Sequence, residues 1–183
     1  MHSLAQRVST LSSIVTTICF AAIALVSIMT LAIPQGSVNS LRFRSSKPIV
    51  TLKNTRNYGA TKNTPKENAR FKFDIVADFS DLVDWNTKQI FTYVYVELDD
   101  VFGSDDNKSN KLVVWDKILT EKDKMYINYK NLKSKYSIWD YDPELHGRTG
   151  HFKLGYNIQP YVGPLSFGEV DLNNTFTFPA TKV

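Results

Sequence analysis

The hydrophobic pattern of the chain is dominated by one uninterrupted apolar stretch near the N-terminus. Residues 11–33, LSSIVTTICFAAIALVSIMTLAI, carry no charge, and the charge-free window extends from Val8 to Leu41. As a helix, these 23 residues would reach roughly 35 Å at about 1.5 Å each, enough to cross a hydrocarbon core of about 30 Å with some tilt. Apolar residues surround the whole predicted helix, which disfavours a buried helix of a soluble protein. We therefore predict a membrane-spanning helix over residues 11–33, preceded by a short tail over residues 1–10.

A cleaved signal peptide is the main alternative for this stretch. Such a peptide has an apolar core of about 7–15 residues and a small-residue cleavage site, for which residues 30–32, TLA, would serve. The apolar run is long for that role, so an uncleaved anchor is favoured. The alternative would leave a secreted β-sandwich binding protein without residues 1–32.

Downstream of Pro34 the apolar period changes to two. Pro34 ends the helix, and residues 34–46 are predicted to be a juxtamembrane linker before a domain that spans residues 47–183. The clearest strand is residues 70–79, in which apolar and mainly polar residues alternate. Residues 89–98, QIFTYVYVEL, predict a second strand because β-branched and aromatic residues fill both of its faces.

Shorter strands separated by turn signals complete the predicted domain. Strands at roughly 8–12 residue spacing are typical of a sandwich or barrel, and no amphipathic helix of credible length follows residue 34. The fold class is therefore all-β, with one transmembrane helix followed by a single antiparallel β-sandwich-like domain. The other strands are predicted at 49–53, 111–120, 125–130, 135–139, 150–158, 166–172 and 175–178, with a polar loop over 54–68.

Composition narrows the chemistry that the domain can perform. The chain has 22 Lys and Arg against 18 Asp and Glu, and the signs are interspersed, so no basic stripe for nucleic acid is present. The single cysteine, Cys19, lies in the apolar stretch. The downstream domain therefore has no disulfide, no thiolate metal site and no thiol nucleophile.

Motifs for catalysis are sparse, and we predict no catalytic residue, cofactor or metal. The three histidines, His2, His146 and His151, have no HExxH-type spacing, and neither a GxSxG elbow nor a phosphate-binding glycine loop occurs. One alternative rests on Asp140 and Asp142, a D-x-D that would suit a divalent metal in a single-pass lumenal glycosyltransferase-like enzyme. The domain is small for that chemistry and lacks a βαβ pattern, so a solvated strand end is the preferred interpretation.

Three blocks of sequence carry a resemblance to a known family. They are FDIVAD at residues 73–78, WNTKQ at residues 85–89 and VVWDKI at residues 113–118, supported by Lys135-Tyr136, Tyr156-Asn157 and Pro160. Together they resemble the signal peptidase complex subunit 3 family, the 22/23 kDa accessory subunit of the endoplasmic reticulum enzyme. Tyr156 stands where that family usually has Trp, and the aromatic character is kept.

The resemblance implies a non-catalytic subunit of the endoplasmic reticulum membrane, with a cytosolic N-terminus and a lumenal domain. Its implied partners are the catalytic serine protease subunit and the other subunits of the complex, with the translocation channel as a further candidate. The positive charges that follow the helix, on Arg42, Arg44, Lys47 and Lys53, instead favour a cytoplasmic domain. Two sequons, at Asn107 and Asn173, are candidate glycosylation sites only if the domain is lumenal.

The turn between the two clearest strands is the candidate contact with a partner. Trp85, Asn86, Lys88 and Gln89 place an aromatic ring beside amides and a cation, a combination that suits an interface. The alternative is structural: Trp85 would cap the core and Asn86 would close the turn.

Overall fold

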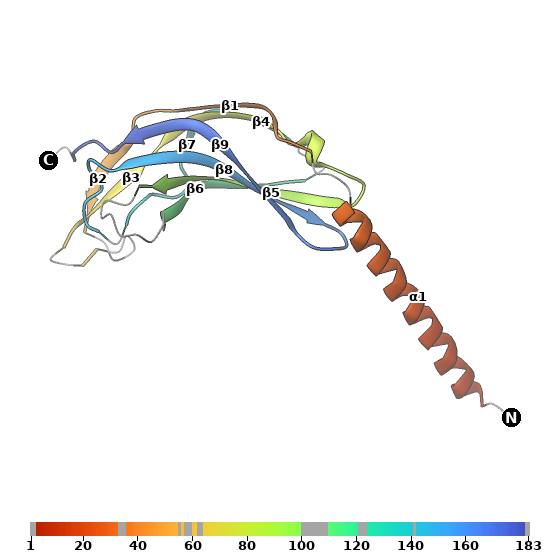
Figure 1. Ribbon diagram of the computed structural model, residues 1–183. Helices are drawn as coiled ribbons and strands as arrows, with labels where there is room; N and C mark the ends of the chain where they lie inside the picture. Colours follow the sequence, from red (N-terminus) through yellow and green to blue (C-terminus); the bar gives the residue numbers. More distant parts are fainter. Residues whose placement is uncertain are drawn as a thin grey trace.

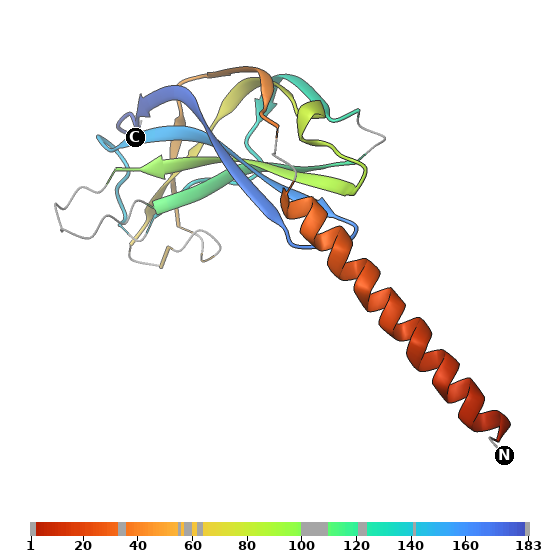
Figure 2. The ribbon, with the colours of Figure 1, turned by 45° about the vertical axis from the view of Figure 1, so that its right-hand side comes forward.

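The computed structural model describes residues 3–32, 36–54, 56, 60–61, 64–99, 110–120, 124–140 and 142–181. A long helix, α1 (Leu4–Ala32), leads into a β domain at its C-terminal end (Figures 1 and 2). The strands are β1 (Asn39–Ser45), β2 (Ile49–Lys53), β3 (Lys66–Arg70), β4 (Lys72–Asp78), β5 (Thr87–Leu98), β6 (Asn110–Leu119), β7 (Tyr126–Lys133), β8 (Thr149–Pro160) and β9 (Ser166–Thr177), with a 3-10 turn, η2 (Ser80–Leu82).

Two antiparallel sheets pack face to face in this domain. One has the order β6-β5-β8-β9 and the other β1-β4-β7, while β2 and β3 pair separately. Figure 1 shows β1 and β4 above β5, β6 and β8, with β2 and β3 at the end farthest from α1. Every pairing between strands is antiparallel, which confirms the all-β, sandwich-like prediction.

The core lies between the two sheets and is built from the alternation seen in the sequence. Even-numbered residues of β5 from Ile90 to Leu98 point inward and are buried, as are the odd-numbered residues from Phe71 to Ala77. The ring centroids of Phe71 and Phe152 lie 5.1 Å apart in an edge contact. Apolar burial and aromatic packing therefore hold the sandwich together without a disulfide.

The prediction of a linker before residue 47 was wrong for residues 39–45, which form β1. This strand pairs with β4, and Phe43 packs against Phe73 and Phe152 at centroid distances of 5.4 and 5.0 Å. Arg42 and Arg44 alternate with the apolar residues and gave the segment the appearance of a charged linker. The chain thus enters the domain within a few residues of α1.

Three other local predictions were also wrong. Residues 66–70, assigned mainly to a polar loop, form β3, whose buried residues Glu67 and Asn68 are polar. Residues 135–139 contribute only a single β-bridge, at Ile138, instead of a strand. The two predicted strands after residue 165 are one strand, β9, with a register shift opposite Phe152 and Lys153.

Helix α1 projects away from the domain and confirms the predicted N-terminal apolar helix. It has 29 residues, none of them buried, and is long and apolar enough to cross a membrane. It begins at Leu4, so part of the predicted tail is also helical.

A buried carboxylate fixes the far end of the sandwich. Glu67 is 7% exposed and accepts hydrogen bonds from the amides of Leu145 (2.7 Å) and His146 (3.0 Å) and from the hydroxyl of Thr181. Burial alone would raise the pKa of this carboxyl, but the hydrogen bonds outweigh burial and leave the pKa below its ordinary value of 4.5.

Replacing Glu67 with Gln is expected to lower the free energy of unfolding by about 1–3 kcal/mol at neutral pH, because charge-assisted bonds are lost. A lowered carboxyl pKa contributes stability above pH 4.5 that is lost as the pH falls through the folded value. Glu67→Gln should therefore also flatten the acid side of the stability profile, measured by denaturant unfolding of the full chain in micelles. Glu144→Gln, at a side chain that is 75% exposed, is the control; equal profiles for both variants would contradict the assignment.

Candidate functional site

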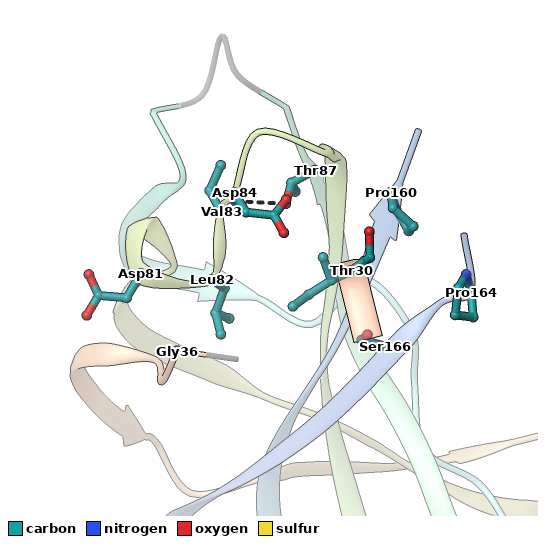
Figure 3. A pocket seen from close by; sticks show the side chains of 11 residues that line it. Thr30, Gly36, Asp81, Leu82, Val83, Asp84, Thr87, Pro160, Pro164 and Ser166 are labelled. Atoms are coloured by element: carbon teal, nitrogen blue, oxygen red, sulfur yellow. Dashed lines mark hydrogen bonds between the residues drawn. The ribbon is translucent and has the colours of Figure 1, made fainter. Parts of the chain in front are cut away.

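The C-terminal end of α1 meets the domain at two neighbouring turns. One is the turn of residues 84–87 that leads into β5, and the other is the tip of the β8–β9 hairpin, residues 161–165. Figure 3 shows Thr30 of α1 pointing into the space between Asp84, Thr87 and the prolines that flank the hairpin tip, Pro160 and Pro164.

Asp84 and Thr87 close the first turn by reciprocal hydrogen bonds. The Thr87 hydroxyl donates to Asp84 Oδ1 over 2.8 Å and accepts from the Asp84 amide over 3.0 Å. Asp84 Oδ1 also accepts from the Asn86 amide over 2.9 Å. An aspartate that binds backbone groups two residues onward favours such a turn, and here it fixes the position of Asn86.

The buried side chain of Asn86 joins the helix to both turns. Its Nδ2 donates to Thr30 Oγ1 and to the carbonyl oxygen of Val162, each over 2.7 Å, and its Oδ1 accepts from the Val162 amide over 3.2 Å. The Asn86 carbonyl oxygen accepts from the Tyr161 amide over 2.8 Å. Asn86 is 3% exposed, so these bonds are shielded from water, and the bond to Thr30 ties the end of α1 to the sandwich.

A small cavity of about 170 Å³ lies beneath this joint. Figure 3 shows its lining on both sides of Thr30, with Asp81 and Leu82 of η2 on one side and Pro164 and Ser166 of the hairpin on the other. Two aspartates with no cation in the lining do not suit an anionic ligand. The cavity lies between the end of α1 and η2, and its lining residues do not indicate a class of substrate.

The structure separates the four predicted contact residues. Trp85 is 63% exposed and does not cap the core, whereas Asn86 is buried in the joint. Lys88 is exposed, and Gln89 donates a side-chain hydrogen bond to Gln159 of β8. Thr30 and the hairpin tip were missed as parts of this site, since only the fold brings them to Asn86.

The outer face of the four-stranded sheet is the second notable surface. One register row across it holds Ile118, Phe91, Asn157 and Phe167, from β6, β5, β8 and β9 respectively. Ile118 is 50% and Phe167 69% exposed. Within the described residues, no element covers this row.

Aromatic rings lie in a line along β5 on the same face. Centroids of Phe91 and Tyr93 are 5.6 Å apart, and those of Tyr93 and Tyr95 are 5.8 Å apart. Tyr93 lies flat over Gly155, where a Cβ atom would come within 2.3 Å of the ring. A glycine is therefore required at that position for the ring to rest against the sheet.

Charged side chains fix the distal end of this aromatic line. Lys111 Nζ lies 5.3 Å from the centroid of the Tyr95 ring and 3.1 Å from Glu169 Oε1. The hydrogen bond from Lys111 holds the pKa of Glu169 below its ordinary value, and burial raises the pKa of Tyr95. The lowered pKa keeps Glu169 ionised at neutral pH, and the raised pKa keeps Tyr95 neutral.

The D-x-D alternative finds no geometric support. Asp140 is buried and paired with Arg148 Nη1, while the exposed Asp142 follows Tyr141, which lies outside the described residues. His151 contacts Asp99 and Thr175 at 3.3 and 3.1 Å. Among the described residues, no cluster of three or more His, Cys, Asp or Glu side chains can hold a metal.

The fold and these surfaces define a β-sandwich that follows an apolar helix long enough to cross a membrane, with a buried hydrogen-bonded joint between the two and a partly exposed apolar sheet face. Comparison with known proteins then gives the family. A family model described as signal peptidase subunit matches residues 1–181.

Relatives described as signal peptidase complex subunit 3 agree with this match. The protein of Debaryomyces hansenii is 44% identical over 142 residues, which cover 78% of this chain and 73% of the relative. That of Yarrowia lipolytica is 37% identical with 93% and 94% coverage, and that of Dictyostelium discoideum is 34% identical with 99% and 96% coverage. The chain belongs to the signal peptidase subunit family.

The joint can be tested by comparing Asn86→Ala with Thr30→Val. Asn86→Ala removes the side-chain bonds to both Thr30 and Val162, so the Val162 amide should exchange its hydrogen at least about tenfold faster, since each lost buried bond costs about 1–3 kcal/mol. Thr30→Val removes only the helix contact and should leave that amide protected. Hydrogen exchange of the full chain in micelles measures both, and similar protection of Val162 in the two variants would contradict the role of Asn86.

Proposed function

We propose that this chain is a non-catalytic accessory subunit of the endoplasmic reticulum signal peptidase that positions the catalytic serine protease subunit for removal of signal peptides. Family membership supports the assignment to the complex. The observation that carries the positioning role is the aromatic face of β5, on which Phe91 and Tyr93 are half-buried and Tyr95 is buried, with Ile118 and Phe167 exposed beside them. The bond from Asn86 to Thr30 joins the start of this strand to α1.

The aromatic face has the properties of a protein docking surface. Its rings are already held by the sheet and by Lys111, so little side-chain entropy is lost when a partner covers them. Large rigid aromatic side chains are enriched where binding energy concentrates. In Figure 1 β5, β6 and β8 of this sheet lie below β1 and β4, on the side toward which α1 runs.

Gln89, near the start of β5, lies on the same face as Phe91 and extends the proposed contact. Lys88 is its exposed neighbour in the chain. Asn86 belongs to this proposal indirectly: it is buried and orients the strand that carries the contact residues. Trp85 lies beyond the end of this face and has another role, argued below.

Positioning is a sufficient reason for such a subunit to affect catalysis. A displacement of about 1 Å in an active site can reduce the rate about a hundredfold. A rigid joint between a membrane helix and a docking face sets the height and tilt of a bound protease domain relative to the bilayer. Signal peptides are cleaved near the membrane, so that height matters to the reaction.

We also propose that the domain is lumenal. The sequon residue Asn173 is exposed on β9, where its amide donates to Asp171 Oδ1 over 2.7 Å, and is accessible to glycosylation. Asn107 lies outside the described residues. The positive charges of β1 that oppose this orientation belong to a folded strand of the domain, and so are weaker evidence about a membrane flank than a free linker would be.

The docking face is tested by Ile118→Asp, with Ile49→Asp as the matched control. Ile118 and Ile49 are 50% and 54% exposed, but Ile49 lies on β2 at the opposite end of the domain. A buried unpaired charge should weaken copurification of the catalytic subunit more than about tenfold for Ile118→Asp alone. Signal peptide cleavage in cells depleted of the native chain should fall in parallel. Equal behaviour of both variants would contradict the proposed face.

Orientation is tested with tagged full-length chains in sealed endoplasmic reticulum vesicles. Added protease should remove an N-terminal tag and spare a C-terminal tag until detergent is added. Asn173→Gln should abolish a glycosidase-sensitive mobility shift if this sequon is used. Loss of the C-terminal tag from intact vesicles would show a cytosolic domain and overturn the lumenal assignment.

A further inference from the structure

The tip of the β8–β9 hairpin is an exposed apolar surface beside the membrane helix. Tyr161 is 66% exposed, Leu165 50%, and Trp85 in the adjoining turn 63%. No charged residue occurs from residue 154 to residue 168, the whole half of the hairpin nearest α1. We propose that this tip, with Trp85, inserts into the interfacial layer of the lipid bilayer and is a second membrane contact besides α1.

The packing of the tip against α1 sets its depth. A Cβ atom on Gly163 would lie 3.6 Å from Cα of Ser27, and Asn86 beside the tip bonds Thr30. Ser27 precedes the end of α1 at Ala32 by five residues, or about 7.5 Å along the axis. The tip therefore lies below the last turn of the helix instead of above it.

The position of the bilayer along α1 follows from its charges. Arg7 is the only charged residue of the helix, and the uncharged window begins at Val8. A hydrocarbon core of about 30 Å takes up about 20 helical residues, so a core that begins at Val8 ends near Ser27 and one that begins at Leu11 ends near Thr30. Gly163, which touches Ser27, is thus placed at the boundary between hydrocarbon and headgroups.

The side chains at that boundary suit the interface chemically. Trp and Tyr are enriched at headgroup level because their rings are apolar and their N–H and O–H groups remain hydrated. Asp84, the nearest carboxylate in sequence to Trp85, is held within its own turn by Thr87. Since residues 154–168 carry no cation, the attraction is apolar, and a vesicle of phosphatidylcholine should suffice without anionic lipid.

This contact requires that α1 spans a bilayer, but it is independent of the docking of a protease. Two anchoring points would limit tilting of the domain about the end of α1. The Asn86 joint alone resists that motion through one hydrogen bond to α1, from Asn86 to Thr30. Insertion of the tip adds resistance from the membrane itself.

Spin labels at Leu165 and Leu52 provide the test. Cys19→Ser is first introduced into the full chain, and a single cysteine is then added as Leu165→Cys. The matched control is Leu52→Cys, because the Leu52 side chain is 54% exposed and lies on β2, far from the helix. In phosphatidylcholine vesicles, the accessibility of the label to oxygen relative to a water-soluble nickel complex should be several-fold higher at residue 165 than at residue 52. Tyr161→Cys, at a tip side chain that is 66% exposed, is the second test position if Leu165→Cys fails to fold.

Two results would overturn the proposal. Equal, water-like accessibility at residues 165 and 52 in vesicles would place the tip in solvent. A tip label that is water-accessible in the isolated chain and becomes shielded from both reagents only in the assembled complex would assign the surface to a protein partner. Because the isolated chain contains no protease subunit, neither result depends on the docking face.

Discussion

The placement of the membrane helix on the β-sandwich depends on one buried amide, the side chain of Asn86. Its three side-chain hydrogen bonds use both ends of the amide and connect α1, the β5 turn and the hairpin tip. An aspartate would lose the two donated bonds, and an alanine all three. Asn86 thereby connects the strand that carries the proposed docking face to the membrane helix.

The prediction of the fold from sequence succeeded where burial was strong and failed where it was partial. Residues 70–79 and 89–98 cross the centre of the sandwich, so one or both faces are apolar and the period of two is visible. Strand β3 buries Glu67 and Asn68, whose carboxylate and amide serve tertiary contacts, and no period in hydrophobicity remains to show a strand. Hydrogen bonds that buried polar side chains make with distant residues cannot be predicted from the spacing of apolar residues along the chain.

The sequence identified residues 85–89 as part of the site, but it did not predict which distant residues they contact. The turn chemistry of residues 84–87 is local, so an aspartate followed by an asparagine and a threonine predicts it. The role of Asn86 depends on Val162 and Thr30, which are 76 and 56 residues away. These residues meet only because β5 pairs with β8 and because the end of α1 packs against the domain. The spacing of residues within the motif predicts neither the strand register nor the position of the helix.

The two longest uncharged segments of the chain meet at the joint, and both lack charge for the same physical reason. Residues 8–41 contain the helix, and residues 154–168 form the half of a hairpin that packs against its last turns. A charge costs about 2.5–3.5 kcal/mol at the centre of a bilayer and less toward the interface, so a segment held at that depth tolerates polar but not ionised side chains. The hairpin shares this restriction although it is a strand pair in a water-exposed domain. Most of this protein lies outside the membrane. The uncharged β-hairpin, together with its contact with α1, therefore indicates where the membrane surface meets the domain.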